Sequence, residues 1–151
     1  MTVEPWSEEH ARAVAAWHYE PPYDFYDLAS DPDDEAELFD PERWPRYRAV
    51  LGDDGELAAF WFFRPDGEAL ELGLGLRPDL TGRGLGGTFA SAALEYARGE
   101  WSPRRFALHV AAWNDRAIRV YERLGFREVG RETRAFELVG EHEFVAMERA
   151  A

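Results

Sequence analysis

The residues best suited to chemistry begin with a glycine-rich segment in the middle of the chain, Arg77–Gly87. It lies between a pattern typical of a strand and a pattern typical of a helix. Glycine lets backbone amides approach a ligand closely, and the N-terminus of a helix carries a positive dipole. The segment therefore predicts a binding site for a pyrophosphate or a similar polyanion, in preference to a plain glycine-rich turn.

The same glycines also fit a second kind of protein. Gly82, Gly84 and Gly87 match the spacing G-x-G-x-x-G of dinucleotide-binding proteins. That motif follows its strand closely, whereas five residues separate Leu76 from Gly82. No acidic residue lies near the position about 20 residues after Gly87, where such proteins bind the ribose. A nucleotide-dependent oxidoreductase is therefore the less favoured alternative.

A second group of reactive side chains lies in the segment Leu108–Phe126. His109 carries an imidazole, which titrates near neutral pH, and Tyr121 carries a phenol that can donate a proton. Asn114 is suited to cap a helix. Glu71 lies earlier, on a strand in which leucines alternate with other residues. His109 and Glu71 are thus two candidates for a general base.

Both segments resemble those of the GNAT superfamily of acyl-CoA-dependent N-acyltransferases. Thr81–Gly86 is similar to the pyrophosphate loop of that family, Gln/Arg-x-x-Gly-x-Gly/Ala, with Thr81 in place of the first residue. The resemblance covers Glu68–Val129 and implies an α/β fold with a central mixed sheet, a splayed parallel strand pair and about four helices. The matching positions in the second segment are Asn114, Ala117-Ile118, Tyr121 and Gly125-Phe126.

The resemblance implies an N-acetyltransferase that moves an acetyl group from acetyl-CoA to a primary amine of a small molecule or a peptide N-terminus. The amine would attack the thioester directly. Tyr121 would donate a proton to the leaving thiolate, and His109, Glu71 or water would deprotonate the amine. A non-catalytic, regulatory acyl-CoA-binding domain is the alternative. The residues expected at acetyl-CoA are Leu74, Gly75, Leu76, Thr81, Gly82, Arg83, Gly84, Leu85, Gly86, Gly87, Asn114 and Tyr121.

An aromatic and acidic segment early in the chain is the expected acceptor site. The resemblance implies an acceptor-binding loop there, and aromatic rings beside carboxylates suit a cationic amine. The equally favoured alternative is a loop whose rings only pack on the sheet. The expected acceptor-binding residues are Trp17, Tyr19, Tyr23, Asp24 and Tyr26.

The hydrophobic pattern predicts the elements that would position these residues. Ser7 is expected to cap the first helix, one short helix is expected within Asp27–Glu42, and Asn114 is expected to cap the last helix, which would end at Gly125. A helix over Leu85–Arg98 is expected to stop at Gly99. The predicted strands are Thr2–Pro5, Arg46–Leu51, Leu57–Phe63, Leu70–Leu76, Arg105–Ala111 and a final hairpin around Val139–His142.

The pattern of the strand Leu70–Leu76 also predicts where the pantetheine arm of acetyl-CoA lies. Its leucines share one face, while Glu71, Gly73 and Gly75 share the other. A strand face without side chains allows another chain to approach its backbone. We therefore expect pantetheine to lie close to the two glycines.

Composition sets the outer limits of these interpretations. The 151 residues fit one domain, residues 1–151. The chain has no cysteine, which excludes a thiolate zinc site or a cysteine nucleophile, and all 17 basic residues are arginine, which excludes a lysine Schiff base. No signal peptide or apolar membrane segment is evident, so we expect a cytoplasmic protein. We also expect a monomer or homodimer, and no metal.

Charge is distributed unevenly along the chain. The net charge of -13 argues against nucleic acid or a membrane as a partner. Residues 1–76 hold 19 acidic residues and 5 arginines, whereas residues 77–134 hold 11 arginines and 7 acidic residues. A polyanion such as acetyl-CoA would therefore favour the second segment, and a cationic amine would favour the first.

Overall fold

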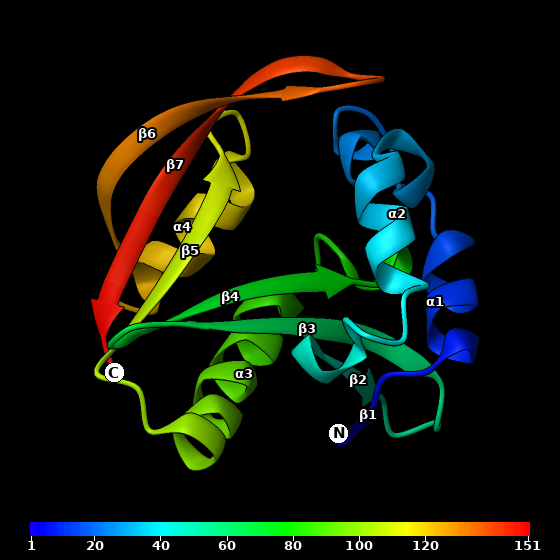
Figure 1. The fold of residues 1–151 in the computed structure, drawn as a ribbon, viewed down its shortest axis with the longest axis horizontal. Coiled ribbons are helices and arrows are strands. Elements are labelled where there is room, and N and C mark those ends of the chain that lie inside the picture. The colour runs from blue at the N-terminus through cyan, green and yellow to red at the C-terminus, as the bar shows by residue number, and fades with distance from the viewer.

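Seven strands form one mixed sheet, which a computed structural model describes over residues 1–151 (Figure 1). The strands lie in the order β1-β2-β3-β4-β5-β7-β6, and every neighbouring pair is antiparallel except β4 and β5. The predicted mixed α/β sheet with a parallel pair is thereby confirmed. The strands are β1 (Thr2–Pro5), β2 (Tyr47–Leu51), β3 (Leu57–Asp66), β4 (Ala69–Leu76), β5 (Arg105–Ala111), β6 (Arg127–Phe136) and β7 (Gly140–Ala150).

Four α-helices cover the two faces of the sheet. Alternate residues of β2 divide between two hydrophobic clusters, with Val50 in the larger one and Ala49 in the smaller one. Because alternate residues of a strand point to opposite faces, the two clusters lie on opposite sides of the sheet. The larger cluster includes α3 and part of α4, and the smaller one includes α1 and α2. The helices are α1 (Glu8–Ala15), α2 (Pro32–Leu38), α3 (Leu85–Trp101) and α4 (Asp115–Arg123).

The leucine face of β4 lies against α3, as its alternation predicts. Leu70 and Leu72 are buried in the larger cluster together with Phe89 and Ala93 of α3. Burying a leucine side chain contributes about 2 kcal/mol. Because the leucines of β4 face α3, the other face of the strand is on the side of the sheet that α1 and α2 cover. That other face carries Glu71.

The parallel pair holds together over only three residue positions. Ala69, Leu70 and Glu71 pair with residues 105–107 of β5, and no pairing between the two strands follows. Beyond that point β4 stays bonded to β3, and β5 stays bonded to β7. Figure 1 shows the two strands diverging toward different ends of the molecule. The splayed parallel pair is therefore present.

The helix ends agree with the sequence in one case and differ in another. Asn114 caps α4 by accepting a bond from the Ala117 N–H at 3.1 Å, as predicted. The predicted stop of α3 at Gly99 is wrong, because the helix continues to Trp101. The ring of Trp101 packs 4.9 Å from that of Phe63, between ring centroids. Such packing offsets the cost of glycine inside a helix, about 1 kcal/mol.

The expectation of a bare glycine face on β4 is also wrong. The ring of Phe60, on β3, lies directly over Gly75, so that a Cβ atom there would overlap it. Phe62 covers Gly73 in the same way at a looser distance, 3.5 Å from such a Cβ. The glycines therefore make room for aromatic rings of the neighbouring strand, and these rings form a floor on that face.

We expect Gly75→Ala to lower the free energy of unfolding by about 1–3 kcal/mol, because the added methyl group displaces the Phe60 ring. Gly73→Ala is the matched control, since its methyl group makes an ordinary contact with Phe62. Urea unfolding followed by tryptophan fluorescence measures both variants. Equal losses of stability in the two variants would contradict this description of the strand.

Candidate active site

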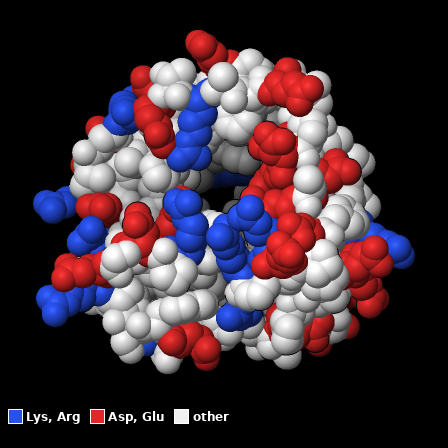
Figure 2. Space-filling model, viewed as in Figure 1, with Lys and Arg blue, Asp and Glu red and all other residues white.

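A cavity of about 840 Å³ opens where β4 and β5 diverge. Its walls come from the ends of these two strands, the loop after β4, helix α4, and the N-terminal segments around α1 and α2. Figure 2 shows a hollow at the centre of this face, with arginine side chains along part of its rim and acidic side chains along another part. The opening is thus lined by opposite charges on different sides.

The glycine-rich loop after β4 borders the cavity. Gly82 and Gly84 have φ angles of +72° and +76°, in the left-handed region that favours glycine. Thr81, Gly82, Gly84 and Gly86 line the cavity, together with Leu74, Gly75 and Leu76 from β4. The predicted residues Arg83, Leu85 and Gly87 are not part of the lining, and Leu85 packs against the larger core cluster instead. The Thr81 hydroxyl donates to the Pro78 carbonyl at 2.6 Å.

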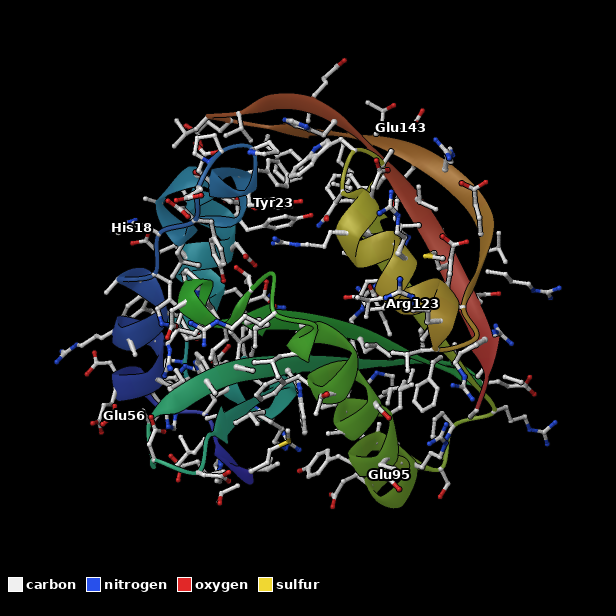
Figure 3. All side chains as sticks on the ribbon, turned by 180° about the vertical axis from the view of Figure 1, so that it is seen from behind. His18, Tyr23, Glu56, Glu95, Arg123 and Glu143 are labelled. Atoms are coloured by element: carbon white, nitrogen blue, oxygen red, sulfur yellow. The ribbon has the colours of Figure 1, made fainter.

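Three arginines of α4 face the same cavity. Arg116, Arg119 and Arg123 are exposed, and none of them has a carboxylate within ion-pair distance. The Arg116 guanidinium stacks 4.0 Å from the centroid of the Tyr23 ring. Figure 3 shows Tyr23 and Arg123 on opposite sides of the opening between α4 and the N-terminal segments. These unpaired cations are available to an anionic ligand.

Tyr121 lines the cavity from α4. Burial, followed by repulsion from Tyr26, raises the pKa of its hydroxyl to about 12. The group therefore stays protonated at neutral pH. A neutral phenol in the cavity lining can donate a proton to a bound group.

Asn114, expected to cap the last helix and to lie at acetyl-CoA, lines the cavity at the start of α4. Its side-chain oxygen caps α4, and its Nδ2 donates to the Tyr26 hydroxyl at 3.0 Å. Asn114 is also buried. Both polar atoms are thus used within the protein, and the residue ties the N-terminal segment to the start of α4.

His109 and Glu71, expected as rival bases, lie next to each other on β5 and β4. His109 lines the cavity, and its Nδ1 lies 3.5 Å from Oε1 of Glu71. Nδ1 is buried and has no hydrogen bond. Glu71 is outside the lining and pairs with Arg64. The two predicted residues are therefore neighbours in one charged group, with the imidazole nearer the cavity.

The acceptor residues predicted from the aromatic segment largely meet at the cavity. Trp17, Tyr19, Tyr23 and Tyr26 line it, whereas Asp24 is exposed and lies outside the lining. The Tyr19 hydroxyl donates to the Leu76 carbonyl at 2.6 Å, which satisfies one carbonyl of β4. Burial, followed by repulsion from Asp27, raises the pKa of Tyr19. Trp17 and Tyr19 thus line the cavity from the N-terminal segment, while Tyr23 and Tyr26 contact the start of α4.

Two carboxylates of α2 were missed by the sequence analysis. Asp34 and Glu37 line the cavity. Asp34 also lines a smaller cavity of about 220 Å³. Burial, followed by repulsion from Asp31 and Glu37, raises the pKa of Asp34 to about 6. The acid-rich composition of residues 27–42 was the available signal, but it did not single out these two positions.

The arginines of α4 could have been recognised in the sequence more easily than the two carboxylates. Arg116, Arg119 and Arg123 follow helical spacing, which places them on one face of a helix that begins at Asn114. The floor residues Phe60 and Phe62 carried none, since their role depends on the pairing of β3 with β4. No group of three or more histidine, aspartate or glutamate side chains is arranged to hold a metal ion.

Comparison with known proteins places this chain in a family. The sequence profile of the acetyltransferase (GNAT) family matches residues 5–126. The chain belongs to the acetyltransferase (GNAT) family, and the resemblance seen in the two motifs is confirmed. The prediction of an acyltransferase enzyme is confirmed at the level of the family, and the oxidoreductase alternative is set aside.

Individual relatives agree with this assignment. Over 77 residues, or 48% of the chain, the sequence is 42% identical to a mycothiol acetyltransferase of Streptomyces coelicolor, and the chain spans about a quarter (24%) of that relative. The spermidine N-acetyltransferase of Vibrio cholerae, solved with CoA and spermine, has a TM-score of 0.76 at 19% identity, covering 99% of this chain and 94% of that one. An acetyltransferase (GNAT family) from Bacillus anthracis has a TM-score of 0.73 at 16% identity, covering 98% of this chain and 93% of that one.

None of the four helices combines the length and the apolar composition that a membrane-spanning helix needs.

Proposed function

We propose that the protein transfers an acetyl group from acetyl-CoA to the primary amine of a cationic acceptor, by direct attack of the amine on the thioester. The observation that carries this proposal is the cavity at the divergence of β4 and β5. One side of that cavity has a glycine loop and unpaired arginines, and the other has aromatic rings and carboxylates. Two substrates of opposite charge would meet between them.

The strand backbone supports acetyl-CoA as the donor. After Glu71 and Ala107, the facing edges of β4 and β5 no longer bond to each other. Buried backbone N–H and C=O groups need partners, and the amides of a pantetheine arm can supply them. Arg116, Arg119 and Arg123, together with the amides of the glycine loop, would hold the phosphates.

The side chains support direct transfer. When bound, acetyl-CoA supplies the acetyl group as a thioester, and the amine nitrogen bonds to the carbonyl carbon as the C–S bond breaks. Tyr121 donates its proton to the leaving sulfur, and the second proton that the nitrogen loses on becoming an amide returns to the Tyr121 oxygen. His109 accepts the proton of the amine on its Nε2 atom. Glu71 faces Nδ1 and favours the imidazole tautomer in which Nδ1 carries the ring proton. Cysteine and lysine nucleophiles are lacking throughout the sequence.

The acceptor wall supports a cationic amine. Asp34 and Glu37 add negative charge to a wall that includes Trp17, Tyr19 and Tyr47. Aromatic faces and carboxylates together attract an ammonium group. The similar enzyme of Vibrio cholerae was solved with spermine, a polyamine, which agrees with this choice of class.

Thiol release from acetyl-CoA tests the proposed function. The panel is putrescine, spermidine, glucosamine, alanine amide and glutamate, with a control that lacks an amine. Because the sequence has no lysine, its own side chains provide no acceptor in that control. We expect release that depends on the cationic amines and is weak with glutamate. If no amine gives thiol release but acetyl-CoA raises the melting temperature, the result would favour a non-catalytic binding domain. A preference for glutamate would contradict the proposed class of acceptor.

We expect Tyr121→Phe to lower kcat by about 100-fold, because the leaving thiolate loses its proton donor. The affinity for acetyl-CoA, measured by calorimetry, should stay the same. Tyr96→Phe is the matched control, since the Tyr96 hydroxyl accepts a bond from Arg48 Nε and is not part of the cavity lining. An unchanged rate in Tyr121→Phe would remove this residue from the mechanism.

We expect Asp34→Asn to raise the KM for the cationic acceptor about fivefold at pH 8, through loss of charge attraction. Its raised pKa of about 6 gives a pH signature. The carboxyl group is neutral below that value and charged above it, so the wild-type KM should fall as pH rises from 5 to 7. Asp33→Asn is the control on the same helix, because Asp33 is exposed and outside the lining. An identical pH dependence in wild type and Asp34→Asn would refute this role.

A further inference from the structure

A row of charged side chains crosses the sheet face below the cavity. Arg64 on β3 pairs with Glu71 on β4, and Glu71 faces His109 on β5. On its other side, His109 Nε2 lies 3.2 Å from Oε1 of Glu132 on β6. Arg134 holds Glu132 at 2.6 Å. His109 thus lies between two carboxylates, each of which is balanced by its own arginine.

The sheet order makes the contact between β5 and β6 possible. Strand β7 lies between them, yet its residue opposite His109 is Ala146. The residue of β6 opposite Ala146 is Gly130. These two small residues leave the space through which the imidazole and the Glu132 side chain approach each other across the intervening strand. The contact is therefore produced by the pattern of side-chain sizes on three strands.

The two carboxylates differ in their access to water. The Glu71 side chain is 19% exposed, whereas that of Glu132 is 47% exposed. The bond from Arg134 lowers the pKa of Glu132, so this carboxylate is charged at neutral pH. Glu71 faces the buried Nδ1, and the more exposed Glu132 lies next to Nε2.

We propose that Glu132 is a positioning residue that completes the proton path of the acetyl transfer. This inference rests on the proposed function. His109 Nε2 accepts the proton that the acceptor ammonium loses, which leaves an imidazolium with N–H groups toward Glu71 and Glu132. Glu132 stabilises that cation and then passes the Nε2 proton to bulk water, which returns His109 to its neutral form for the next turnover.

The surrounding charges agree with a path in this direction. The groups that face the imidazole are Glu71 from β4 and Glu132 from β6, while β7 contributes Ala146 and no charge. The nearby Glu128 and Glu143 are both bound to Arg131, at 2.7 Å each. Glu132 is thus the carboxylate of the β6–β7 hairpin that lies within ion-pair distance of His109.

Replacing Glu132 tests the proposal with the acceptor that gives the largest thiol release in wild type. We expect Glu132→Ala to lower kcat about tenfold, as part of the general-base contribution, without a change in either KM. Sodium formate should restore the rate of Glu132→Ala in proportion to its concentration, since a small carboxylate can carry the proton through the vacated space. Sodium chloride at the same concentrations controls for ionic strength.

Glu128→Ala is the matched variant, because Glu128 is an exposed glutamate on the same strand and pairs with Arg131. It should keep the wild-type rate and show no response to formate. Glu132→Gln keeps the side-chain volume and replaces Glu132→Ala in the test if that variant is poorly folded. It should show the same loss of kcat. A wild-type rate in Glu132→Gln, or a loss in Glu132→Ala that formate does not relieve, would overturn the proposal. A wild-type protein without turnover would instead refute the proposed function itself.

Discussion

The early end of the hydrogen-bond ladder between β4 and β5 is the constraint on which the other features depend. The two strands bond at three positions and then part, while each stays bonded to its other neighbour. The divergence leaves backbone donors and acceptors facing a cavity in the middle of the sheet. Such groups are costly unless a ligand or water satisfies them. The gap is therefore a place where a ligand or water can bond to the strand backbone.

The two halves of the sheet are held together across this gap by a few contacts. Asn114 bonds to Tyr26, and Arg116 stacks on Tyr23, so the start of α4 is tied to the N-terminal segment that borders the acceptor side. The same helix carries the arginines proposed to hold the phosphates. One helix thus contacts both proposed substrate regions, which explains how opposite charges can line the same opening (Figure 2).

Local signals in the sequence predicted the central unit well. The alternation of leucines predicted β4, the glycine-rich loop predicted the start of α3, and Asn114 predicted the start of α4. Tyr121, which lies on the same unit, was singled out by the resemblance of its segment to the GNAT family and not by periodicity. Gly99 was misread because the packing of Trp101 on Phe63, which extends α3, is a tertiary effect.

Features that depend on strand order could not be predicted from the sequence. The covering of Gly75 by Phe60 needs the register of β3 with β4, and the contact of His109 with Glu132 needs β7 between β5 and β6. Each involves residues far apart in the chain, and no local pattern marks them. The acidic wall is similar, since composition indicated the region but only the cavity identified Asp34 and Glu37.

We propose that the gap between β4 and β5 is the donor site, which a crystal structure of the protein with S-ethyl-CoA, an unreactive analogue of acetyl-CoA, can test. We expect the pantetheine arm to lie between residues 72–76 and 108–111, bonded to the strand backbone, with the pyrophosphate on the amides of residues 82–86. Binding of the analogue elsewhere on the molecule, with the gap filled only by water, would contradict it.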